Sequence, residues 1–208
     1  NADDILLPSS LRTTVGGLLS SSELGIAYGD VFRIDENTAV YPEPFAKAKA
    51  GVFSKENLVL DWYNPVPQPG FIMKRECLNQ LGPLDESLQF AMDFDFWVRL
   101  ILAGTAGRSV NRPVAGFRIH GDAKSSRNQL IRLEERYRIL KTVKTAGWLN
   151  PSELRRSEAA FHLRAIRIAY LAGNSQLMRS EALKHIGQAC LRSAPRAWFF
   201  LGLSLGGD

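Results

Sequence analysis

The sequence has few of the residues that mark several protein classes. Its 208 residues include only two cysteines, Cys77 and Cys190, which stand far apart and exclude a disulfide framework or a cysteine-rich metal site. The longest apolar run, "AWFFLGL" at 197–203, is far shorter than the about 20 residues that a membrane-spanning helix needs. With 45% hydrophobic and 23% charged residues, the chain is predicted to be a globular protein from a reducing compartment, with a sizeable core.

Charge is distributed unevenly along the chain. Residues 1–122 hold 11 Lys and Arg against 15 Asp and Glu, a balance of −4, and residues 123–208 hold 15 against 6, a balance of +9. The two parts are therefore expected to be different units. The basic part either contacts an anionic lipid surface or an acidic protein, or is a solvated helix face. Specific nucleic-acid binding is not expected, because no aromatic platform or known nucleic-acid motif accompanies the charge.

The first part alternates between helix and strand patterns. We predict a helix over 6–19, with Asp3 or Asp4 as its cap and Pro8 in its first turn. A strand over 25–35 should end in a turn near Glu36. Prolines and lysines predict a surface loop over the next two dozen residues, 41–64, with a short helix around 54–60.

The stretch that follows is predicted to bring the backbone close to another element. Three prolines precede Gly70, and 71–73 reads as a short strand. Helices are predicted over 74–81, where Gly82 ends the helix, and over 93–103. Two short strands are expected between 107 and 120.

Only helices are predicted after residue 125. An apolar stripe runs from Leu130 to a stop at Gly147. Asn150, followed by Pro151 and Glu153, predicts a capped helix that extends to Leu171. A third helix over 175–191 is weakly similar to the second helix of a tetratricopeptide hairpin. We therefore divide the chain into 1–126 and a basic helical extension over 127–208.

Three polar clusters lie at predicted element ends: Asn1 to Asp4, Asp93 with Asp95, and Arg118 to His120 followed by Lys124 and Ser125. Such ends gather at one edge of a sheet in α/β folds. Carboxylate ligands suit Mg²⁺ or Mn²⁺ carrying substrate phosphates, and a separate carboxylate can act as a general base. The alternative is structural: the acids cap helices, and His120 is an ordinary hydrogen-bonded residue.

The order of four motifs resembles the second half of a family-2 glycosyltransferase with the GT-A fold. They are "NADDILLPSSL", "AYGDVFRID", "PQPGFIMKRECLNQLGPLDESLQFAMDFDFWVRLILAG" and "FRIHGDAKS", from Asn1 to about Ser126. The resemblance implies an α/β fold class, the second half of a mixed-sheet domain followed by the small all-helical extension. It also implies that the nucleotide-binding half precedes Asn1, so that this chain is a fragment that is inactive alone.

The same resemblance implies roles for the acidic residues. Asp93 falls at the general base and Asp95 at a supporting carboxylate. Asp3 falls at the metal ligand of the DXD-type motif, where Asn1 replaces the usual first acid and Asp4 neighbours the donor diphosphate. The implied cofactor is Mg²⁺ or Mn²⁺.

Further residues are expected around the leaving group and the acceptor. The resemblance places His120 at the diphosphate or the metal, with Arg118, Lys124 and Ser125 holding the leaving group. The acceptor side falls at Gln68, Pro69 and Gly70, with Trp97 on the helix that carries the base.

The function implied is inverting transfer of a sugar from a nucleotide-diphosphate donor to a hydroxyl of a saccharide, lipid-linked or protein acceptor. The expected setting is bacterial cell-surface polysaccharide or glycoconjugate synthesis, in the cytoplasm or peripherally at the inner face of the membrane. Two other classes remain open: a non-catalytic scaffolding module whose helical tail recruits proteins, and a carboxylate-metal hydrolase.

Overall fold

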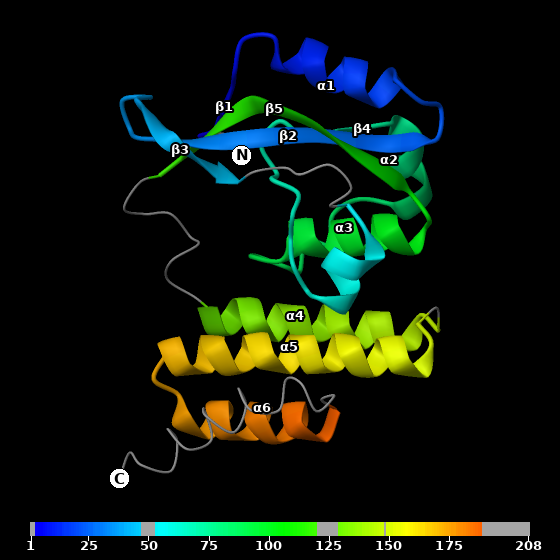
Figure 1. The fold of residues 1–208 in the computed structure, drawn as a ribbon, viewed down its shortest axis with the longest axis vertical. Helices are drawn as coiled ribbons and strands as arrows, with labels where there is room; N and C mark the ends of the chain where they lie inside the picture. Colours follow the sequence, from blue (N-terminus) through cyan, green and yellow to red (C-terminus); the bar gives the residue numbers. More distant parts are fainter. Residues whose placement is uncertain (1–2, 47–52, 120–128, 148, 189–208) are drawn as a thin grey trace. The chain divides into compact units, whose positions relative to one another are not determined.

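The computed structural model describes residues 3–46, 53–119, 129–147 and 149–188, and it divides into two compact units (Figure 1). The sheet unit comprises residues 1–58, 63–87 and 92–123, and the helical unit comprises 59–62, 88–91 and 124–208. Two short segments from the middle of the sequence thus belong to the helical unit.

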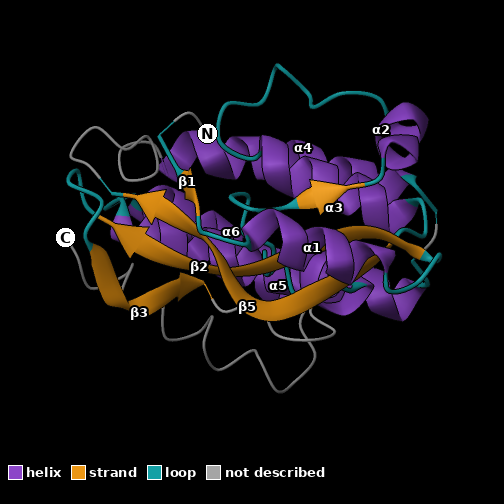
Figure 2. Ribbon diagram, turned by 90° about the horizontal axis from the view of Figure 1, so that it is seen from above, coloured by secondary structure: helices purple, strands orange, loops and turns teal. Residues whose placement is uncertain are grey.

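The sheet unit is built on two long parallel strands, β2 (Leu24–Ile34) and β5 (Ala106–Arg118). The short strand β1 (Ile5–Leu6) pairs antiparallel with β5. The other edge of β2 pairs antiparallel with β3 (Val40–Ala46) and β4 (Ile72–Met73), so the sheet has the order β1-β5-β2-β3 with β4 also on β2 (Figure 2). The predicted α/β class with a mixed sheet is confirmed.

Helices lie on both faces of this sheet (Figure 1). Helix α1 (Ser10–Leu19) contacts β2 and β5 on one face, and α3 (Met92–Leu102) lies on the other. The short helix α2 (Arg75–Leu81) precedes α3 and contacts it. The core is formed mainly by buried side chains of β2 and the apolar side of α3: Ile26, Ala27, Tyr28, Val31, Ile34, Phe94, Phe96, Trp97 and Leu100.

The predicted loop over 41–64 is wrong at its start, where the chain forms β3. Its sequence, VYPEPFA, contains two prolines, which remove backbone donors. Because β3 is at the edge of the described sheet, no further strand needs backbone N–H groups on its outer side, and the prolines are tolerated there. The predicted short helix is confirmed as a π-helical turn, η1 (Glu56–Leu60).

The two predicted strands between 107 and 120 are one strand, β5. Its pairing with β2 shifts register between Ser109 and Pro113, and Asn111 between them has a φ of 50°. Asparagine tolerates this left-handed conformation better than most residues. The polar Asn-Arg-Pro sequence therefore forms a bulge within the strand and does not end it.

The predicted cap of the first helix is also wrong. Helix α1 begins at Ser10, with Ser9 at the N-cap position in a left-handed conformation and without a side-chain capping bond. Pro8 therefore precedes the helix, and residues 5–6 form β1 instead of a helical turn. Asp3 and Asp4 precede this strand, so they do not cap the helix.

The helical unit contains α4 (Gln129–Thr145), α5 (Pro151–Leu171) and α6 (Ser175–Gln188). The predicted capping box is confirmed: the Asn150 side chain accepts the N–H groups of Ser152 and Glu153, each at 3.0 Å. Leu133 and Leu140 of the predicted stripe are buried, whereas Leu130 is 38% exposed. Helices α5 and α6 pack through a buried cluster of Ile166, Ala169, Met178 and Ala182. The predicted end of the third helix at 191 lies outside the described residues.

Candidate functional site

Asp93 occupies the first turn of α3, as predicted, and its side chain is partly buried. One carboxylate oxygen accepts the backbone N–H of Phe94 at 2.7 Å, and the other accepts the Asn64 side-chain amide at 3.3 Å. The Asn64 side-chain oxygen in turn accepts the N–H of Val66 at 3.2 Å. The carboxylate is therefore held at the helix start, with a defined partner from a loop almost thirty residues earlier.

Asp95 points to a partner on its own helix. Its carboxylate accepts from Arg99 Nε at 2.8 Å, one turn further along α3. The Arg99 guanidinium also donates to the carbonyls of Leu81 and Pro83, at 2.9 and 3.0 Å. Asp95 thus orients an arginine that ties α3 to the end of α2, and its support of the base stays a prediction.

The backbone just before α3 is held by one carboxylate of the helical unit, Glu135 on α4. It is 4% exposed and accepts three successive N–H groups, from Gln89 at 2.7 Å, Phe90 at 2.9 Å and Ala91 at 2.7 Å. Such charge-assisted bonds are about twice as strong as neutral ones. The last of the three N–H groups belongs to a residue only two positions before Asp93.

The segment 59–62, which leads to Asn64, is also held within the helical unit. Trp62 is 1% exposed, donates from its indole to Ser157 Oγ at 3.0 Å and packs edge-on against Phe161. The Ser157 hydroxyl donates to the Val59 carbonyl at 2.7 Å. Arg156 binds the Asp61 carboxylate at 2.7 Å. Sequence reasoning missed these contacts, because no local pattern marks a bond between residues 95 positions apart.

Asp3 and Asp4 lie just before β1, beside the end of β5 and the turn between β2 and β3. Asp4 accepts the N–H of Arg118 at 3.0 Å, beside the pairing of β1 with β5. The Arg118 guanidinium donates to the carbonyls of Asp3, Asp35 and Glu36 and to Thr38 Oγ1. Arg118 therefore ties the β2–β3 turn to the start of β1, and its contact with a donor diphosphate stays a prediction.

The predicted acceptor side forms a tight turn against β5. Phe71 donates its N–H to the Gln68 carbonyl at 3.4 Å across Pro69 and Gly70, and Gly70 has a φ of 73°. Pro followed by Gly with positive φ is typical of a type II turn. A Cβ on Gly70 would lie 2.6 Å from Val114 Cγ2, so the predicted close approach is confirmed.

Trp97 is 3% exposed and joins this turn to α3. Its ring contacts Phe71, with centroids 4.3 Å apart, and Phe96, with centroids 5.9 Å apart. The predicted packing of this side of α3 into the core is confirmed. Contact of Trp97 with an acceptor stays a prediction.

Four predicted site residues lie outside the described residues: Asn1, His120, Lys124 and Ser125. Among the residues that the structure describes, no group of three or more His, Cys, Asp or Glu could hold a metal ion. Asp3 is exposed. The convergence of Asp3, Asp93 and His120 on one donor site stays a prediction.

Another buried polar cluster lies between α5 and α6. Glu181 is fully buried and is bound by His162 Nδ1 at 2.7 Å and by Lys184 Nζ at 2.6 Å. Burial alone would raise the pKa of Glu181, but His162, Lys184 and the nearby Tyr137 hydroxyl lower it to about 2. Burial and the Glu181 carboxylate raise the pKa of Tyr137. The Glu181 carboxylate is therefore ionised at neutral pH, and its bonds to His162 and Lys184 stabilise the packing of the helices.

In the sheet unit, burial raises the pKa of Tyr28 to about 12, a shift that the Phe53 backbone partly opposes. The phenol, fully buried in β2, is therefore neutral at physiological pH. A neutral Tyr28 adds no charge to the sheet core.

Comparison with known proteins gives one partial match. No protein-family model matches the chain. A protein of Methanocaldococcus jannaschii, described as an uncharacterized glycosyltransferase, is 30% identical over 106 residues, which are 49% of this chain and 34% of that protein. The chain thus spans about a third of the length of the relative it matches. This similarity supports a glycosyltransferase relationship for the chain.

Proposed function

We propose that the chain carries the catalytic and acceptor side of an inverting, metal-assisted glycosyltransferase of the family-2 type with the GT-A fold. The observation that carries the proposal is the Asp93 carboxylate, partly buried at the start of α3 and held by Asn64. Its support outside the structure is the partial match to a protein named a glycosyltransferase.

The chemistry requires a carboxylate in this setting. A sugar hydroxyl is a poor nucleophile at neutral pH, and a general base that removes its proton during attack contributes about 10²- to 10⁴-fold. In the proposal Asp93 takes this proton as the acceptor oxygen attacks the anomeric carbon. The nucleoside diphosphate leaves from the opposite face, so the configuration inverts.

The leaving group requires positive charge, which Mg²⁺ or Mn²⁺ supplies when bound. Asp3 fits this role because its carboxylate is exposed and Mg²⁺ is commonly held by one or two carboxylates together with substrate phosphates. Arg118, His120, Lys124 and Ser125 are proposed to bind the diphosphate oxygens, with Asp4 fixing the backbone of Arg118. Gln68, Pro69 and Gly70 shape the acceptor side.

The partners in this proposal are a nucleotide-sugar donor and a saccharide, lipid-linked or protein acceptor in cell-surface polysaccharide or glycoconjugate synthesis. The setting is the cytoplasmic side of the membrane. None of the helices in the described ranges is long and apolar enough to cross a membrane.

The test is an Asp93→Asn substitution in the complete protein that contains this chain. Sugar transfer should fall by about 10²- to 10⁴-fold, while donor binding and thermal stability stay close to the parent. Asp85→Asn is the matched control, because Asp85 is exposed and an asparagine keeps an oxygen for its bond to the Ser87 N–H. Asp3→Ala should weaken metal-dependent donor binding. If Asp93→Asn and Asp3→Ala both behave like the parent, the non-catalytic scaffolding function replaces the proposal.

A further inference from the structure

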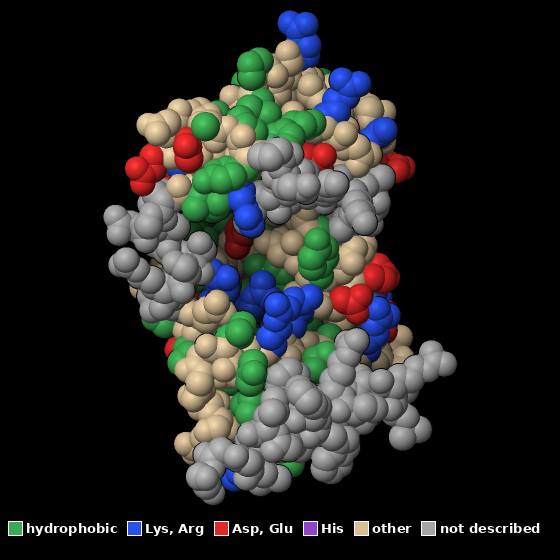
Figure 3. Space-filling model, turned by 60° about the vertical axis from the view of Figure 1, so that its left-hand side comes forward, with side chains coloured by type: hydrophobic (Ala, Val, Ile, Leu, Met, Phe, Trp, Pro, Cys, Tyr) green, Lys and Arg blue, Asp and Glu red, His purple; other side chains and the backbone are tan. Residues whose placement is uncertain are grey.

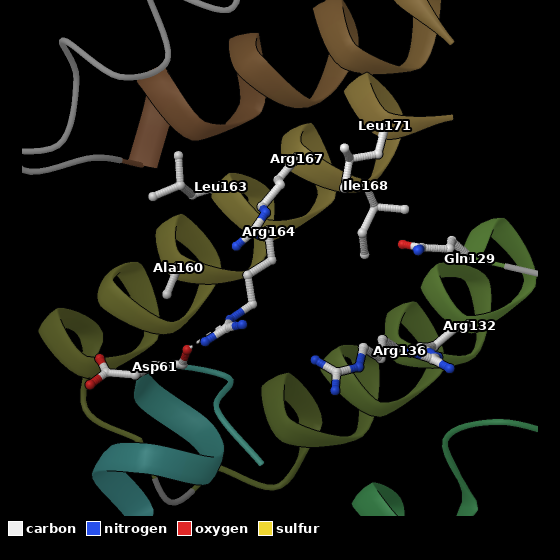
Figure 4. A pocket seen from close by; sticks show the side chains of 10 residues that line it. All are labelled: Asp61, Gln129, Arg132, Arg136, Ala160, Leu163, Arg164, Arg167, Ile168 and Leu171. Atoms are coloured by element: carbon white, nitrogen blue, oxygen red, sulfur yellow. Dashed lines mark hydrogen bonds between the residues drawn. The ribbon is translucent and has the colours of Figure 1, made fainter. Parts of the chain in front are cut away.

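The helical unit contains a cavity of about 840 Å³, and all the described residues that line it belong to this unit. Arg132 and Arg136 reach it from α4, and Arg164 and Arg167 reach it from α5 (Figure 4). Among the residues that the structure describes, Asp61 is the only acid in the lining. Four guanidinium groups against one carboxylate make the cavity strongly cationic.

Local contacts fix part of this cationic lining. Arg164 donates to the Asp61 carbonyl at 3.1 Å, and Arg136 donates to the Trp62 carbonyl at 3.4 Å. The Asp61 carboxylate accepts from Arg156, so its charge is already compensated. Guanidinium groups held in this way suit phosphate, which they bind through two parallel hydrogen bonds.

The lining is also apolar along α5, where Leu163, Ile168 and Leu171 line the cavity together with Arg164 and Arg167. Gln129 and Leu171 line the same cavity, so the start of α4 and the end of α5 meet there. Leu171 is 62% exposed at this end. Figure 3 shows Lys and Arg side chains gathered with hydrophobic ones on one face of the helical unit.

Arginines beside apolar side chains, one of them an exposed leucine, are typical of surfaces that lie in the headgroup region of a bilayer. A site for a small soluble anion needs the arginines but not the apolar side chains. We propose that this cavity binds the phosphate headgroup of an anionic membrane lipid, with the exposed Leu171 at its end entering the interface. The idea that this cavity anchors a transferase rests on the proposed function. Lipid binding itself can be measured without any sugar transfer.

The test compares two double substitutions in the full chain by co-sedimentation with vesicles. Arg132→Gln with Arg167→Gln removes two cavity arginines and leaves Arg136 and Arg164 on their carbonyl partners. Arg138→Gln with Arg155→Gln removes the same charge from α4 and α5 but from exposed residues that do not line the cavity. At 100° per residue, Arg155 lies on the side of α5 opposite Arg164.

The parent should bind phosphatidylcholine vesicles that contain phosphatidic acid, and pure phosphatidylcholine vesicles far more weakly. Each arginine near an anionic surface contributes about fivefold to binding, so the partition coefficient of the double variant Arg132→Gln with Arg167→Gln should fall about thirtyfold. The control variant Arg138→Gln with Arg155→Gln should stay close to the parent. Equal losses in both pairs would mean diffuse attraction and would overturn the proposal, as would the absence of vesicle binding. Circular dichroism shows whether each pair keeps its helices.

Leu171 provides a second test. Leu171→Gln should weaken binding to the phosphatidic acid vesicles, whereas Leu183→Gln, at a leucine of α6 that is 60% exposed, should not. Calorimetry with inorganic phosphate separates the two sources of the anion. Inorganic phosphate that binds the cavity while the vesicles do not would identify a free-anion site and overturn the lipid assignment. Failure here would leave the Asp93→Asn result unaffected, so the two proposals fail separately.

Discussion

Replacing Glu135 by glutamine should loosen the backbone that precedes α3. A carboxylate offers two acceptor oxygens: in the native chain one accepts from Gln89, and the other accepts from Phe90 and Ala91. An amide offers only one oxygen, and its NH₂ group would face a backbone N–H donor. At least one hydrogen bond to a charged group is lost, and a buried donor stays unpaired.

The loss can be estimated from these bonds. A hydrogen bond to a charged group contributes about 1.5–3 kcal/mol, and an unsatisfied buried donor costs about 1–3 kcal/mol. Because the two terms overlap, we expect the free energy of unfolding to fall by about 2–4 kcal/mol in Glu135→Gln. Glu134→Gln, at the exposed neighbouring residue, should stay within about 0.5 kcal/mol of the parent.

Two measurements check this prediction. Urea unfolding followed by tryptophan fluorescence gives the loss of stability. Amide hydrogen exchange gives its location, because the protection of Gln89, Phe90 and Ala91 should fall more than that of β2. A Glu135→Gln protein with unchanged stability and unchanged exchange at these three amides would refute the reasoning.

Three further predictions follow from other contacts. Glu181 has its pKa lowered from 4.5 to about 2, so it adds stability above pH 4.5 that is lost as the pH falls toward 2. Because Lys184 is half-exposed and screened by solvent, about 1–2 kcal/mol is expected, and Glu181→Gln should flatten this part of the acid-unfolding curve. Gly70→Ala should destabilise by about 1–3 kcal/mol, because it combines backbone strain with a Cβ contact on Val114. Gly104→Ala, at a similar φ after α3, meets nothing within 4 Å and should cost less in thermal unfolding. Ser157→Ala leaves the buried Trp62 indole N–H without its acceptor and should cost about 1–3 kcal/mol in urea; a change below about 0.5 kcal/mol would contradict this structural role.

Local sequence patterns predicted the elements whose causes are local. The Asn150 capping box and the strand β2 depend on neighbouring residues, and both were predicted correctly. The strand β3 was missed because its prolines are tolerated only at a sheet edge, and the sequence does not say which strand lies at the edge. The bulge at Asn111 was read as a break for the same reason: pairing to β2 decides whether the strand continues.

The same distinction between local and distant causes applies to the candidate site. The position of Asp93 at a helix start follows from nearby residues, as does the close approach at Gly70. The three hydrogen bonds of Glu135 to the backbone do not follow from nearby residues. A single glutamate within a helix gives no sign that it is buried against a distant loop. The predicted capping by Asp3 and Asp4 failed because the chain first adds a short strand to β5.

The bonds of Glu135 and Ser157 have a consequence for the order in which the molecule matures. They join residues 44 to 46 and 95 to 98 positions apart, and contacts so distant in sequence form late. On the ribosome, the loop before α3 would emerge well before the helix that secures it. A truncation after residue 126 would therefore remove more than a peripheral extension: it would leave Asn64 and Asp93 at the ends of two unanchored backbone segments.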